Sequence, residues 1–139
     1  MSHAPQGWVA APADGRRPGG RAVLLALLVA AVAVQLVVLY APGDVGPLPF
    51  PHADKVVHVG VFLVPVALAL LAGFRGATVV AVFAGQALVS ELVQWRLLGD
   101  RSGDVVDVLA DLTGVVLGVV VARLAGPALA RRSAVRGPV

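Results

Sequence analysis

Residues 100–120 read DRSGDVVDVLADLTGVVLGVV and combine two patterns that suit different environments. The second half is as apolar as a membrane-spanning helix, whereas the first half carries four acids, of which Asp107 and Asp111 are the deepest. In a helix, the polar residues and glycines from Arg101 to Gly118 recur at spacings of three and four and therefore share one face. Because ionised groups facing lipid are costly, this face should contact protein.

The same face changes from charged residues at its start to glycine at greater depth. Gly114 and Gly118 form a small-xxx-small pair, which allows another helix to approach closely. The segment is therefore expected to pack its polar and glycine stripe against a neighbouring helix.

The composition is that of an integral membrane protein. Hydrophobic residues make up 58% of the 139 residues and charged residues 14%, against roughly 25% in soluble domains. The chain has no cysteine, which excludes disulfides and thiolate chemistry. Basic residues flank apolar runs, a topology signal rather than a nucleic-acid surface, so no nucleic-acid partner is expected.

Four apolar stretches approach the ~20 residues that a spanning helix needs. They cover residues 22–40, 56–72, 77–95 and about 105–125. Their short connections predict that consecutive helices are antiparallel neighbours. The predicted fold is therefore an all-α membrane protein, a four-transmembrane-helix antiparallel bundle with the lipid bilayer as its environment.

The distribution of Lys and Arg predicts that both termini are cytoplasmic. With the N-terminus inside, eight basic residues lie on the cytoplasmic side and three outside. The predicted organisation is a disordered cytoplasmic tail (1–20), a four-helix domain (21–126) and a basic cytoplasmic tail (127–139). Cleavage of residues 16–34 as a signal is an alternative, but the apolar run continues to Tyr40, longer than a usual signal core.

The second and third segments also carry polar faces at the outer end. Asp54 and His58 are four residues apart on the second segment, and Glu91 and Gln94 lie near the end of the third. The economical arrangement is a shared polar pocket between segments two, three and four that opens outward. The first segment, almost wholly apolar, is expected to pack outside this pocket.

Three motifs together resemble the VanZ-like family of small bacterial multi-pass membrane proteins. They are DKVVHVGVF (54–62), ELVQ (91–94) and RSGDVVDVLADLTGVVLG (101–118). Asp111 departs from the family pattern, which usually has Asn at that position. The resemblance implies a bacterial cell-membrane protein with a role in the envelope or in resistance to the lipoglycopeptide teicoplanin. The positions that match the family motifs are Asp54, Lys55, His58, Glu91, Gln94, Arg101, Asp104 and Asp107.

The polar residues support several functions. The favoured hypothesis is a pocket for an amphiphilic envelope ligand, either a lipid headgroup, a lipid-linked wall precursor or a lipoglycopeptide. Its predicted binding residues are Asp54, Lys55, His58, Glu91, Gln94, Arg101, Asp104, Asp107 and Asp111.

The main alternative is a membrane enzyme that uses His58, Glu91 or Asp107 as acid and base or to bind a metal. We assign no cofactor and no metal, since the absence of cysteine and of a second nearby histidine disfavours a tight zinc site. A proton- or cation-coupled transporter is a less favoured alternative, because four helices are few for transport unless the protein forms an oligomer. A purely structural ion-pair network is the remaining alternative.

Crowding of the acids predicts an unusual charge state. The pocket carries five acidic and two basic residues, a net charge of −3 with His58 neutral. We therefore expect at least one of Glu91, Asp107 and Asp111 to be protonated or bridged by a cation. His58 should be protonated if it contacts Asp54 or Asp107.

Overall fold

The computed structural model describes residues 18–40, 50–97 and 105–135, and within them the only regular secondary structure is helical. Each helix is long and apolar enough to cross a membrane, which confirms the predicted fold class. The helices are α1 (Pro18–Tyr40), α2 (Ala53–Leu71), α3 (Gly76–Leu97) and α4 (Val105–Val135).

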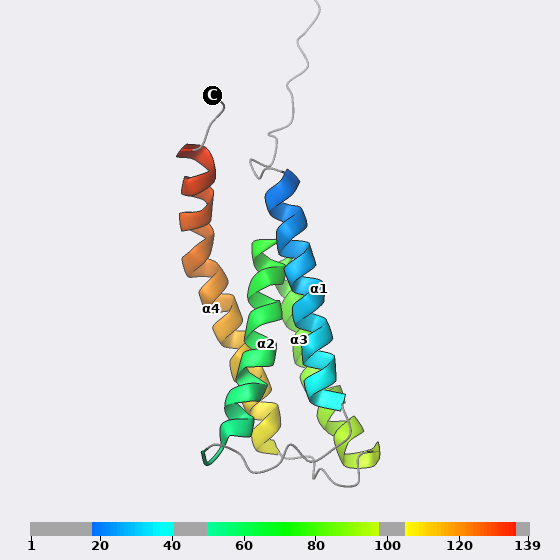
Figure 1. The fold of residues 1–139 in the computed structure, drawn as a ribbon. Helices are drawn as coiled ribbons and strands as arrows, with labels where there is room; N and C mark the ends of the chain where they lie inside the picture. Colours follow the sequence, from blue (N-terminus) through cyan, green and yellow to red (C-terminus); the bar gives the residue numbers. More distant parts are fainter. Residues whose placement is uncertain (1–17, 41–49, 98–104, 136–139) are drawn as a thin grey trace, which may run out of the picture.

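Consecutive helices run in opposite directions, so α1 begins and α4 ends at the same end of the bundle (Figure 1). The opposite end holds the start of α2, the end of α3 and the start of α4. α2 is the central element, because it packs against each of the other three helices and lies between α1 and α4. We call the end where α2 and α4 begin the polar end.

The last helix is longer than the predicted apolar segment. α4 continues beyond residue 125, through Pro127, to Val135, so part of the predicted basic tail is helical. Hydropathy identifies the residues that can lie in lipid. Backbone hydrogen bonds do not depend on hydropathy, so a helix can continue into polar sequence. Within α4 only residues 105–129 fit a membrane span.

The most extensive helix contact joins α2 and α4, which are parallel and not consecutive in the chain. A Cβ added at Gly114 would collide with the carbonyl oxygen of Val59 and lie 2.8 Å from Cβ of Phe62. A Cβ added at Gly118 would lie 2.7 Å from the carbonyl oxygen of Leu63. The two glycines thus bring the helix backbones together, which confirms the predicted close approach.

An apolar core lies deeper along the same contact than the polar end. Phe62 of α2 is fully buried and meets Phe83 of α3 edge to face, with ring centroids 6.5 Å apart. Such aromatic pairs add to the packing of neighbouring helices. This core fixes α3 beside α2 and α4 and thereby positions the polar side chains at the end of the bundle. Its buried members are Leu39, Phe62, Val66, Ala69, Val79, Phe83, Ala87 and Val115.

Candidate functional site

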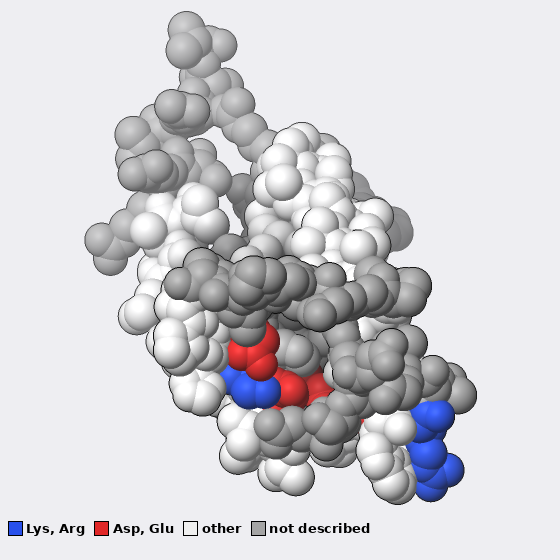
Figure 2. Space-filling view, turned by 60° about the horizontal axis from the view of Figure 1, so that its bottom comes forward, with Lys and Arg blue, Asp and Glu red and all other residues white. Residues whose placement is uncertain are grey.

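Polar side chains connect α2 and α4 where both helices begin. The ammonium Nζ of Lys55 donates to Oδ1 of Asp107 at 2.5 Å and also lies 3.0 Å from Oδ2 of Asp54. In Figure 2 acidic side chains and an adjacent basic side chain appear together at this end. The lysine is therefore held between carboxylates of its own helix and of α4.

One turn deeper, His58 of α2 pairs with Asp111 of α4, the position at which this sequence departs from the family motif. Nδ1 of His58 lies 2.8 Å from Oδ1 of Asp111, and Asp111 is completely buried. Nε2 of the same ring lies 4.0 Å from Oδ1 of Asp107, too far for a hydrogen bond. The imidazole is thus fixed by one carboxylate and turned toward a second.

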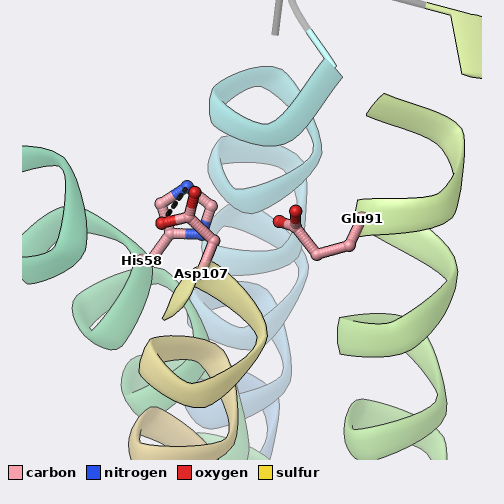
Figure 3. Close-up of side chains that lie close together, drawn as sticks. All are labelled: His58, Glu91 and Asp107. Atoms are coloured by element: carbon pink, nitrogen blue, oxygen red, sulfur yellow. Dashed lines mark ion pairs between the residues drawn. The ribbon is translucent and has the colours of Figure 1, made fainter. Parts of the chain in front are cut away.

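The third helix contributes Glu91, which is 6% exposed. Figure 3 shows its carboxylate directed from α3 toward His58 of α2 and Asp107 of α4. One potential ligand atom from each of these three residues lies within 4.8 Å of the other two. Side chains from three helices therefore converge on one small volume. We call His58, Glu91, Asp107 and Asp111, with Lys55 and Asp54 at the rim, the polar cluster.

Gln94 of α3 reaches the first helix rather than the polar cluster. Its Nε2 donates to the carbonyl oxygen of Leu39 at 3.0 Å. Leu39 is in the last turn of α1, where carbonyl groups have no partner within the helix, so this bond caps α1. This bond ties α1 to α3 beside the polar cluster, and the expectation that α1 packs outside the polar pocket stays a prediction.

Gln35 of α1 was not among the functional candidates predicted from the sequence. Gln35 is completely buried, and neither Oε1 nor Nε2 has a hydrogen-bond partner within the described part of the chain. It precedes Leu39 by one turn, as Ser90 precedes Gln94, and α1 and α3 run in the same direction. This register puts Gln35 at about the same depth along the bundle as Ser90. In the sequence, Gln35 is distinguished only as the one amide in an apolar run.

Most of the predicted binding residues come together in the structure. The helices place Asp54, Lys55, His58, Glu91, Asp107 and Asp111 in one cluster, with Gln94 beside it. The exposures decrease inward, from 40% for the Asp54 side chain to 13% for Asp107 and none for Asp111. Arg101 and Asp104 lie outside the described residues.

The polar cluster concentrates negative charge. It contains four carboxyl groups and one ammonium group, so with His58 neutral its formal net charge is −3. Burial in an apolar bundle makes such an excess costly unless protons, cations or hydrogen bonds compensate it. His58 makes its short contact with Asp111, which the conditional expectation about its protonation did not name, and its Nε2 lies 4.0 Å from Asp107.

An open groove of about 540 Å³ lies at the other end of the bundle, between α2, α3 and α4. Its wall is mainly apolar, and Arg123 is its one charged residue. An apolar groove within a membrane-spanning bundle is an ordinary contact surface for lipid chains. The ionisable side chains of the polar cluster lie at the polar end, away from this groove.

The fold and the cluster define a class, the small four-helix membrane proteins that carry ionisable residues between helices at one end. The chain belongs to the VanZ/LLP1 family, whose model matches residues 29–126. The match covers α2 and α3 completely and α1 and α4 in part, and it includes the described polar cluster. No curated protein and no solved structure matches the chain significantly.

Proposed function

We propose that this VanZ/LLP1 family member binds the polar headgroup of an amphiphile at the outer surface of a bacterial cell membrane. The ligand class comprises lipid headgroups, lipid-linked wall precursors and lipoglycopeptides such as teicoplanin. The supporting observation is the convergence of His58, Glu91 and Asp107 from three helices. Ionisable groups inside a membrane bundle are expensive and mark binding or transport sites, so their gathering at one end favours a ligand there.

The outward orientation rests on the basic residues. Eight Lys and Arg residues lie in segments assigned to the cytoplasmic side and three in segments assigned to the outside. Positively charged residues accumulate on the cytoplasmic side of membrane proteins. The polar end then faces outward, and residues 1–20 and 127–139 lie at the cytoplasmic side.

The cluster offers complementary partners to a headgroup. Lys55, held by Asp54 and Asp107, presents a charged donor for a phosphate or carboxylate. Glu91 and Asp107 accept hydrogen bonds from hydroxyl or ammonium groups of the ligand. Arg101 and Asp104 complete the proposed binding set from the adjoining segment, with Gln94 at its border.

Equilibrium binding to the protein in nanodiscs tests this proposal. The probes are teicoplanin, a polyprenyl phosphate and phosphatidylglycerol, each titrated against wild-type protein, Lys55→Met and Asp107→Asn. We expect saturable binding of at least one probe, weakened about tenfold or more in both variants, because each loses a charge-assisted contact. Thr113→Ala is the matched control on α4, since Thr113 bonds to its own helix and is exposed.

Two results would reject a headgroup site. One is that none of the three probes binds saturably. The other is that binding is equally strong in Lys55→Met, Asp107→Asn and wild-type protein, which would place any ligand elsewhere on the bundle.

A second candidate is acid–base chemistry on an outer-leaflet lipid, and the His58–Asp111 pair favours it. A carboxylate that holds one imidazole nitrogen orients the other nitrogen for proton transfer. Incubation of proteoliposomes with labelled phospholipids, followed by analysis of the products, tests this reaction. Turnover that is lost in His58→Gln would support it, and intact lipids with wild-type protein would reject it for that substrate class.

A further inference from the structure

Three side chains of the polar cluster have the composition and spacing of a metal site. His58, Glu91 and Asp107 each place one nitrogen or oxygen within 4.8 Å of the others, and His58 and Glu91 are more than nine-tenths buried. They come from α2, α3 and α4, so the bundle itself sets their separation (Figure 3). Cations in protein sites are commonly held by such convergent ligands from separate helices.

The histidine is oriented as a ligand would be. Asp111 occupies Nδ1 at 2.8 Å, which leaves Nε2 on the side of Asp107. Histidines that bind metals usually donate their other ring N–H to a carboxylate, which fixes the tautomer and turns the free lone pair to the ion. The separation of 4.0 Å between Nε2 and Oδ1 of Asp107 leaves these two atoms without a direct bond.

An independent observation also favours a bound cation or its water at this place. The second carboxylate oxygen of Asp111, Oδ2, is completely buried and has no hydrogen-bond partner within the described residues. Native proteins rarely leave such an atom unsatisfied, so this oxygen suits a water molecule bound to an ion.

We propose that Nε2 of His58 and one carboxylate oxygen each of Glu91 and Asp107 bind a single divalent cation of the manganese or zinc type. One imidazole and two carboxylates form a mixed donor set that such ions accept, whereas magnesium and calcium prefer oxygen alone. Lys55 binds Oδ1 of Asp107, the oxygen that lies 4.0 Å from Nε2 of His58, so the ion would bind Oδ2 or share Oδ1 with the ammonium group. The formal charge of the cluster then changes from −3 to −1.

Three protein ligands leave a coordination position for water or for another oxygen. A phosphate oxygen of a headgroup can take this position beside Lys55, and this extension rests on the function proposed above. The ion and Lys55 would then hold the same anionic group from two sides. The ion site itself requires no lipid.

Electron paramagnetic resonance of Mn²⁺ added to metal-free protein in detergent tests the site without any lipid probe. We expect the signal of free Mn²⁺ to decrease until one ion is bound per chain, and Zn²⁺ to compete. His58→Gln, Glu91→Gln and Asp107→Asn should each weaken binding about tenfold to a hundredfold or more. Asp54→Asn removes the same charge from a half-exposed carboxylate outside the three ligands. This variant should change the affinity for Mn²⁺ less than about threefold.

A readout on unmutated protein covers the case in which these variants misfold. The bound ion should show electron spin-echo modulation from an imidazole nitrogen, and ¹⁵N labelling of histidine should change that modulation. Absence of saturable binding below about 1 mM, the weak end for protein calcium sites, would overturn the proposal. So would bound Mn²⁺ without nitrogen coupling, or equal losses in Asp54→Asn and Asp107→Asn. Headgroup binding without the ion would leave the proposed function in place and reject the metal alone.

Discussion

Nδ1 of His58 lies 2.8 Å from Oδ1 of Asp111, and this pair links α2 to α4 at a fully buried position. Lys55 and Asp107 form the preceding link of the same interface, and Gly114 against Val59 forms the next. From the polar end inward, the interface between α2 and α4 therefore contains an ion pair, then a buried polar pair and then a backbone contact, all within a few turns. The close glycine packing holds the two helices in the register that the polar pairs require.

The first prediction concerns this packing. Gly114→Ala should lower the free energy of unfolding by about 1–3 kcal/mol, because the added methyl group overlaps the α2 backbone. Gly126→Ala is the control, since nothing lies within 4 Å of its added Cβ on the same helix. Unfolding in mixed detergent micelles provides the measurement. Equal stability of both variants would mean that α2 and α4 are not in close contact.

The second prediction concerns the ion pair at the rim. A double-mutant cycle with Lys55→Met and Asp107→Asn should give a coupling free energy of about 0.5–3 kcal/mol, because both side chains are mostly buried. The cycle of Lys55→Met with Asp54→Asn is the comparison. Its coupling should be smaller, near the ~0.2–1 kcal/mol of exposed pairs, because the Asp54 side chain is 40% exposed. A larger coupling to Asp54 than to Asp107 would contradict the described geometry.

A third prediction follows from the buried amide of α1. Gln35→Met keeps the length of the side chain and removes two polar atoms that have no partners. It should therefore raise the free energy of unfolding of the protein without bound ion or ligand by about 1–3 kcal/mol. Gln94→Met should instead destabilise it by about 1 kcal/mol, since its bond to Leu39 is lost. Thermal unfolding in detergent compares the two variants. Destabilisation by Gln35→Met would show that the amide has a partner in the empty protein.

The fourth prediction concerns orientation, on which the proposed function depends. The chain has no cysteine, so single cysteines can be introduced without a background. Ser102→Cys should react with an impermeant thiol reagent in intact cells, and Ser133→Cys should react only after the membrane is opened. The reverse pattern would put the polar end in the cytoplasm and exclude a site for outer-surface ligands.

Much of the fold followed from the sequence because lipid imposes strong constraints. Long apolar segments must form helices, and the spacing of Asp107, Asp111, Gly114 and Gly118 identifies one face that avoids lipid. That reasoning predicted the close contact at the glycines and the convergence of three polar faces at one end.

The pairings within the cluster did not follow from the sequence. Helical spacing tells which residues share a face, but the partner of each depends on the relative rotation and depth of two helices. Asp111 was therefore not matched with His58 in advance, although both belonged to the predicted set. Gln35 was missed because one amide in an apolar helix has no periodicity, and only its burial without a partner distinguishes it.

The central claim is that α3 and α4 place Glu91, Asp107 and Asp111 around the imidazole of His58 on α2. The chain has three histidines, so His3→Gln and His52→Gln leave His58 as the single source of imidazole signals in ¹⁵N solid-state NMR of the protein in bilayers. We predict that Glu91→Gln, Asp107→Asn and Asp111→Asn each shift the ring nitrogens of His58, with the largest change at Nδ1 in Asp111→Asn. Thr113→Ala should shift neither nitrogen. Unchanged His58 signals in both Glu91→Gln and Asp107→Asn would contradict a shared site.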